Sequence, residues 1–109
     1  MNAAHNLDFQ AINSAVLANP SFLQKRLPDS HFEGKRLHAA SLNGGKGRSF
    51  NLDTETGAWF DHPTEERGND AVSLVAAQEG ISQGAAKKLI ESELGISRAF
   101  QLANCLNIV

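Results

Sequence analysis

The hydrophobic pattern of this chain changes its period twice, and this change limits the possible folds more than any other feature. Apolar residues recur at helical spacing over residues 1–30 and again over 69–107. Between them, residues 34–61 alternate apolar and polar side chains, as strands with one buried face do. A β-hairpin region of two or three antiparallel strands is not stable alone and needs helices against one face. The pattern therefore predicts an α+β fold, a small antiparallel β-sheet flanked by helices.

Turn and cap residues mark the boundaries of these elements. The sequence Asn-Gly-Gly-Lys-Gly at 43–47 carries too much glycine for a regular element and predicts a loop. Residues 53–57 predict a second turn, whose last residue, Gly57, suits a positive φ. Residues with capping or helix-ending chemistry predict the helix boundaries. These residues are Asp8, Asn19, Pro20, either Asn69 or Asp70, Gly80, Ser82 and Gly95.

Length and composition restrict the class of protein. The chain has 109 residues, which predicts a single domain over 1–109, and a net charge of −2, which excludes a strongly basic, histone-like binder. Its one cysteine, Cys105, excludes an internal disulfide and a cysteine-rich zinc finger. The sequence has no apolar run long enough for a membrane span or a signal peptide. We therefore expect a soluble cytoplasmic protein.

Three short segments follow one another in a distinctive order. They are Arg-Ser-Phe-Asn-Leu at 48–52, Thr-Gly-Ala-Trp-Phe-Asp at 56–61 and Gly-Asn-Asp-Ala-Val-Ser-Leu-Val at 68–75. This order resembles the N-terminal zinc-binding domain of bacterial-type DNA primases. It is more similar still to the zincless relatives that begin primase-helicase proteins of phages, plasmids and other mobile elements. The resemblance covers residues 20–97, where Leu-Gly-Ile at 94–96 ends the second helix, and it implies a zinc-ribbon-like fold.

The resemblance also implies that this zinc-ribbon-like scaffold has lost its metal. The zinc-bearing primases hold zinc with a Cys-x-x-His before the first of these strands and a Cys-x-x-Cys after the second. Those places fall here on Ala40, Asn43, Asp61 and Thr64, of which only the carboxylate of Asp61 is a possible ligand. We therefore expect no metal and no other cofactor. A replacement set is the alternative, but its members do not have metal-site spacing: His5, His31, His38, His62 and Cys105.

A basic segment around the glycine loop is the main candidate binding site. Residues 34–51 contain Lys35, Arg36, Lys46 and Arg48 and no acidic residue, a local charge of +4. Lysine and arginine side chains together with loop amides suit the phosphates of a nucleic acid backbone. The alternative is a solvated hairpin loop with ordinary surface charges.

Two adjacent aromatic residues, Trp59 and Phe60, point to opposite faces of their strand. One of them belongs in the core, and the other is free to stack on a base. We predict that Trp59 is the stacking residue, because its strand neighbours the basic loop. The alternative is that helices cover both.

The acidic segment 61–70 raises the question of catalysis. Its carboxylates, Asp61, Glu65, Glu66 and Asp70, have the chemistry to bind Mg²⁺ or to act as acid and base. They stand on a predicted loop without a nucleophile or a phosphate-binding motif. The resemblance assigns no catalysis to this domain, so we expect a module that is not an enzyme, with a solvated acidic loop.

The last predicted helix begins at Ser97 and is apolar through Phe100, Leu102 and Leu106. Chain ends are usually polar, so these residues predict an interaction surface or a chain cut from a longer protein. The alternative is that this segment packs on the protein's own core.

The predicted function is a non-catalytic nucleic-acid-binding and template-recognition module of a primase-helicase-type DNA replication protein from a phage or mobile element. Its expected partners are single-stranded or template DNA, bound weakly and in a salt-sensitive way, and a primase or helicase domain, but no membrane. The alternative is a protein-interaction or small regulatory module that does not bind DNA and acts through the apolar C-terminal helix.

Overall fold

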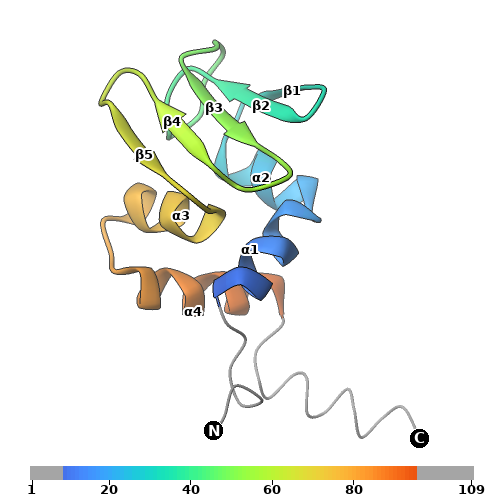
Figure 1. Cartoon of the computed structure of the whole chain (residues 1–109), viewed down its shortest axis with the longest axis vertical. Helices are drawn as coiled ribbons and strands as arrows, with labels where there is room; N and C mark the ends of the chain where they lie inside the picture. Colours follow the sequence, from blue (N-terminus) through green and yellow to red (C-terminus); the bar gives the residue numbers. More distant parts are fainter. Residues whose placement is uncertain (1–8, 96–109) are drawn as a thin grey trace, which may run out of the picture.

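Antiparallel strands form one side of the protein in the computed structural model, which describes residues 9–95 (Figure 1). In this part of the chain five strands make one sheet, and each is paired with the next along the sequence in the order β1-β2-β3-β4-β5. The strands are β1 (His31–Glu33), β2 (Arg36–Ala39), β3 (Phe50–Asp53), β4 (Trp59–Asp61) and β5 (Glu66–Gly68). The α+β class is confirmed, but the sheet is larger than the two or three strands predicted.

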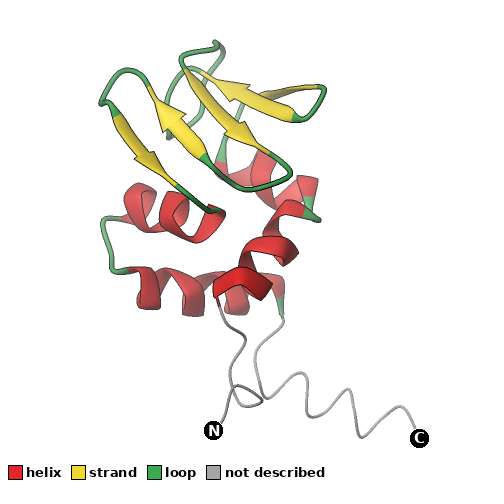
Figure 2. Ribbon diagram, viewed as in Figure 1, coloured by secondary structure: helices red, strands yellow, loops and turns green. Residues whose placement is uncertain are grey.

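The helices lie together on one side of this sheet (Figure 2). They are α1 (Phe9–Leu17) and α2 (Pro20–Arg26) before the strands, and α3 (Ala71–Glu79) and α4 (Gln83–Leu94) after them. The predicted caps are confirmed where the structure describes them. The side chains of Asn19, Asp70 and Ser82 accept hydrogen bonds from the first turns of α2, α3 and α4, and Gly80 and Gly95 end α3 and α4 in the left-handed conformation.

Burial alternates along the three central strands, so the sheet has an inner face against the helices and an outer face toward solvent. The inner face supplies Leu37, Ala39, Phe50, Leu52 and Trp59 to the core. Helix α3 lies between the sheet and α4, and five of its nine residues are buried. Within residues 9–95, no helix covers the outer face of the sheet.

The glycine loop between β2 and β3 is fixed against the end of α2. Ser41 and Gly44 form an isolated β-bridge, and the Gly45 amide donates to the Pro28 carbonyl oxygen at 2.6 Å. Gly44 has φ of 101°, and a Cβ there would lie 2.6 Å from the Pro28 side chain. Only glycine satisfies both this backbone conformation and this close approach.

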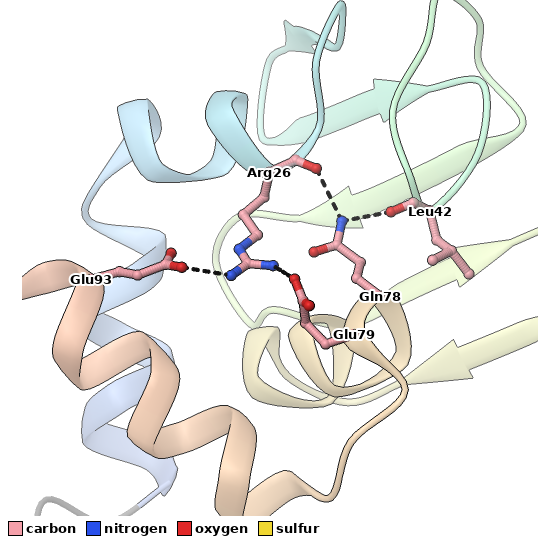
Figure 3. A network of polar contacts seen from close by, with 5 residues as sticks. All are labelled: Arg26, Leu42, Gln78, Glu79 and Glu93. Atoms are coloured by element: carbon pink, nitrogen blue, oxygen red, sulfur yellow. Dashed lines mark hydrogen bonds and ion pairs between the residues drawn. The ribbon is translucent and has the colours of Figure 1, made fainter.

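A polar network ties three helices to that loop (Figure 3). The Arg26 guanidinium binds the carboxylates of Glu79 in α3 and Glu93 in α4, with N···O distances of 2.5 and 2.9 Å. The Gln78 amide nitrogen donates to the carbonyl oxygens of Arg26 and Leu42, at 3.1 and 2.6 Å. This network joins the C-terminal ends of α2 and α3 on the helical side of the molecule.

Some predictions lie outside residues 9–95. These are the Asp8 cap, Cys105 and the apolar last helix with Phe100, Leu102 and Leu106. None of the helices in the described part of the chain is long and apolar enough to cross a membrane.

Candidate nucleic-acid interface

A row of planar side chains crosses the outer face of the sheet, with one residue from each strand. The strand register pairs His31 with His38, His38 with Asn51, Asn51 with Phe60, and Phe60 with Arg67. With neighbouring strands about 4.8 Å apart, the row is about 19 Å long. We call these five residues the planar row.

Contacts along the planar row hold its aromatic groups in place. The rings of His31 and His38 lie 5.6 Å apart between centroids. The Arg67 guanidinium carbon lies 5.3 Å from the centre of the Phe60 ring, and the His62 ring meets Phe60 edge-on at 4.5 Å. Phe60 therefore has a cation at its ring and an aromatic neighbour at its edge.

Two further groups shape the electrostatics of this face. The Arg36 guanidinium donates to the side-chain oxygen of Asn51 at 2.9 Å, which places a cation beside the row. Burial lowers the pKa of His38, and the neighbouring Arg48 lowers it further. The lowered pKa favours the neutral form of His38 at physiological pH, and Arg36 supplies a positive charge beside it.

The structure does not bring the four predicted cations into one patch. Lys35 lies in the β1–β2 turn, and its ammonium binds the Glu55 carboxylate at 2.7 Å, an interaction that raises its pKa. Arg48 comes from the β2–β3 loop at the other end of β2 and pairs with Glu33. Among residues 9–95, Lys46 has no ion-pair partner. The predicted charge of +4 is thus partly neutralised by carboxylates just outside the basic segment.

The prediction that Trp59 stacks on a base is wrong. Trp59 is 5% exposed, and its indole Nε1 donates to the Ser73 hydroxyl of α3 at 2.9 Å. Phe60 occupies the outer face instead. The sequence contains information on this orientation. Phe50 and Leu52 define the inner face of β3, and the short turn at 53–57 pairs Trp59 with Leu52, so the Trp59 side chain lies on the same face.

Of the four positions that the resemblance aligns with zinc ligands, Asp61 and Thr64 contact each other. Asp61 is fully buried, and its carboxylate accepts a hydrogen bond from the Thr64 hydroxyl at 2.7 Å. Its other carboxylate oxygen has no hydrogen-bond partner in the described residues. Within residues 9–95, no group of three or more His, Cys, Asp or Glu side chains is arranged to hold a metal ion.

The acidic segment is not simply a loop, which corrects the prediction. Glu66 belongs to strand β5, and Asp70 caps α3 by accepting from the Ser73 amide at 2.8 Å. Asp61 is committed to Thr64 in the β4–β5 turn. Glu66 also lies 3.3 Å from the Thr64 hydroxyl, so Asp61 and Glu66 share this contact, whereas Asp70 serves α3. In the described residues, no three of these carboxylates gather as a metal site requires.

No family model, no curated protein and no solved structure matches the chain. The fold and the planar row define an α+β protein whose antiparallel sheet has one face open to solvent.

Proposed function

We propose that the outer face of the sheet binds single-stranded nucleic acid and performs no catalysis. The observation that carries this proposal is Phe60, which projects from β4 at the outer face with the Arg67 guanidinium over its ring. Single-strand binders use the same combination, in which aromatic rings stack on unpaired bases and arginine contributes cation–π contact. The planar groups on either side, from His31 to Arg67, extend this surface across all five strands.

Single strands suit this face better than a duplex does. The bases of a duplex stack on one another, and a flat sheet face cannot reach their planes. An unpaired base can stack on Phe60 once the Arg67 guanidinium, whose carbon lies 5.3 Å from the ring centre, moves aside. Arg36 and Arg67 then lie within reach of the flanking phosphates.

The charge of the chain predicts weak binding. The net charge is −2, and the outer face carries Glu33 and Asp53 besides its arginines. For a site with about three phosphate contacts, the logarithm of the affinity falls linearly with the logarithm of the salt concentration, with a slope near the number of contacts. We therefore expect binding that is readily detected only at low ionic strength.

Replacing Phe60→Ala tests the proposal. The partner is a fluorescently labelled oligothymidine of about eight nucleotides, titrated at low salt and followed by anisotropy. Loss of one stacking contact should weaken binding about tenfold or more. The matched control is Phe32→Ala, since Phe32 is an exposed aromatic on the opposite face of the same sheet, 38% exposed. Equal affinity of Phe60→Ala and the wild type would contradict the proposal.

We further propose that the module recognises template DNA in a primase-helicase-type replication protein of a phage or mobile element. The support is the order of the segments at 48–52, 56–61 and 68–75, together with a predicted zinc-ribbon-like arrangement of strands and helices. This proposal predicts that the coding sequence lies within or beside a primase or helicase gene. A locus that contains neither would count against it.

A further inference from the structure

The Glu33 carboxylate on the outer face contacts two basic side chains from different segments of the chain. The same oxygen of Glu33, Oε2, contacts the His31 Nε2 at 2.7 Å and the Arg48 guanidinium. His31 stands two residues before Glu33 in β1, whereas Arg48 comes from the β2–β3 loop. All three side chains are exposed, at 44% for His31, 42% for Glu33 and 61% for Arg48.

We infer that His31 and Arg48 form a phosphate-binding position at the β1 end of the planar row, and that the Glu33 carboxylate fills it in the free protein. This inference rests on the proposed function and adds a self-inhibiting contact to it. A nucleic acid phosphate would displace the carboxylate and take over both donors.

The chemistry of the contact favours such an exchange. The hydrogen bond from His31 and the charge of Arg48 hold the pKa of the Glu33 carboxyl below its usual range, so the group carries a full negative charge at neutral pH. A phosphodiester carries the same charge, and its paired oxygens fit the guanidinium fork of arginine. Exposed ion pairs contribute little stability, so a competing anion replaces them easily.

The other exposed ion pair near this face lacks this geometry. Glu55 contacts Lys35 between the β3–β4 and β1–β2 turns, and no second basic side chain shares its carboxylate in the described residues. Glu55 therefore serves as the matched control for Glu33.

The position of Glu33 sets the length of ligand that reaches it. Strand β1 is three strands away from Phe60 in β4, which is about 14 Å. A stacked single strand rises about 3.4 Å per nucleotide, so about four nucleotides connect the two positions. A dinucleotide on Phe60 is too short to displace Glu33.

The experiment compares Glu33→Gln with Glu55→Gln in titrations of the same oligothymidine. Glu33→Gln should bind about fivefold more tightly than the wild type. The slope of the logarithm of its affinity against the logarithm of the salt concentration should also steepen, by the amount expected for about one extra phosphate contact. Glu55→Gln should leave affinity within about twofold. The gain should vanish for a dinucleotide, and in the double variant Glu33→Gln with Arg48→Ala.

A second probe separates this inference from the proposed function. Pyrophosphate, which has no bases, should shift the His31 ring resonances in Glu33→Gln at lower concentrations than in the wild type. If Phe60→Ala weakens oligothymidine binding but Glu33→Gln changes neither titration, the phosphate position is overturned and the proposed function stands. If Glu33→Gln improves pyrophosphate binding while Phe60→Ala has no effect, the phosphate position stands and base stacking is overturned.

Discussion

At the scale of single residues, the direction of a side chain on its strand determines its role. Trp59 and Phe60 are neighbours in sequence but lie on opposite faces of the sheet. Trp59 donates a hydrogen bond to Ser73 of α3 on the inner face, whereas Phe60 lies beside Arg67 on the outer face. Alternation along a strand predicts that they diverge, but not which of them is buried. Trp59 is the buried residue because it pairs with Leu52 of β3, so the pattern of its own strand is not enough to predict its burial.

His38 gives the stability of the protein a pH dependence. Because its pKa is lowered in the folded state, mainly by burial, the unfolded chain binds more protons near the ordinary histidine pKa of about 6.5. The free energy of unfolding should therefore fall as pH drops through about 6.5 and level off below the folded pKa. Urea unfolding of His38→Gln should show a flatter profile between neutral pH and about pH 5.

The control for this prediction is Phe32→Ala, which removes a partly exposed side chain of the neighbouring strand that does not titrate. It should keep the pH profile of the wild type. A profile unchanged in His38→Gln would show that burial of His38 does not govern the pH dependence.

At the scale of elements, local chemistry sets the helix boundaries, whereas pairing sets the sheet. Asn19, Asp70 and Ser82 cap helices through bonds to residues three positions away, so the sequence alone predicts them. Strands β1 and β5 have three residues each and lack a buried alternation, so only their pairing with β2 and β4 defines them. The same pairing places Glu33 within reach of Arg48, a contact across 15 residues that the sequence alone does not show.

Arg26 should be the main polar link among the helices. Its side chain is 12% exposed and binds Glu79 and Glu93. Replacing Arg26→Ala should lower the free energy of unfolding by about 1–2 kcal/mol, because two charge-assisted hydrogen bonds and the packing of the side-chain stem are lost. Urea denaturation measures this loss.

Lys35→Ala is the matched control for Arg26→Ala, since it breaks an ion pair whose members are 73% and 59% exposed. It should change stability by less than about 0.5 kcal/mol. Equal effects of the two variants would show that Arg26 is an ordinary surface charge.

At the scale of the whole molecule, the fold separates stability from binding. The helices and the inner face of the sheet contain the core, whereas the outer face carries the planar row and Arg36. Substitutions on the outer face should therefore alter binding without unfolding the protein. The sequence predicted a basic, aromatic binding surface around 34–61, but only the assembled sheet shows that Phe60, Arg67 and the histidines align on one face.

The most direct test of the central claim is a map of backbone amide chemical shifts during titration with single-stranded oligothymidine. Binding on the open sheet face predicts that the largest shift changes cluster on β2, β3, β4 and β5, at Arg36, Asn51, Phe60 and Arg67. The outward surface of α4 should remain unchanged. Shift changes confined to the helical side, or no saturable change at low salt, would contradict the account.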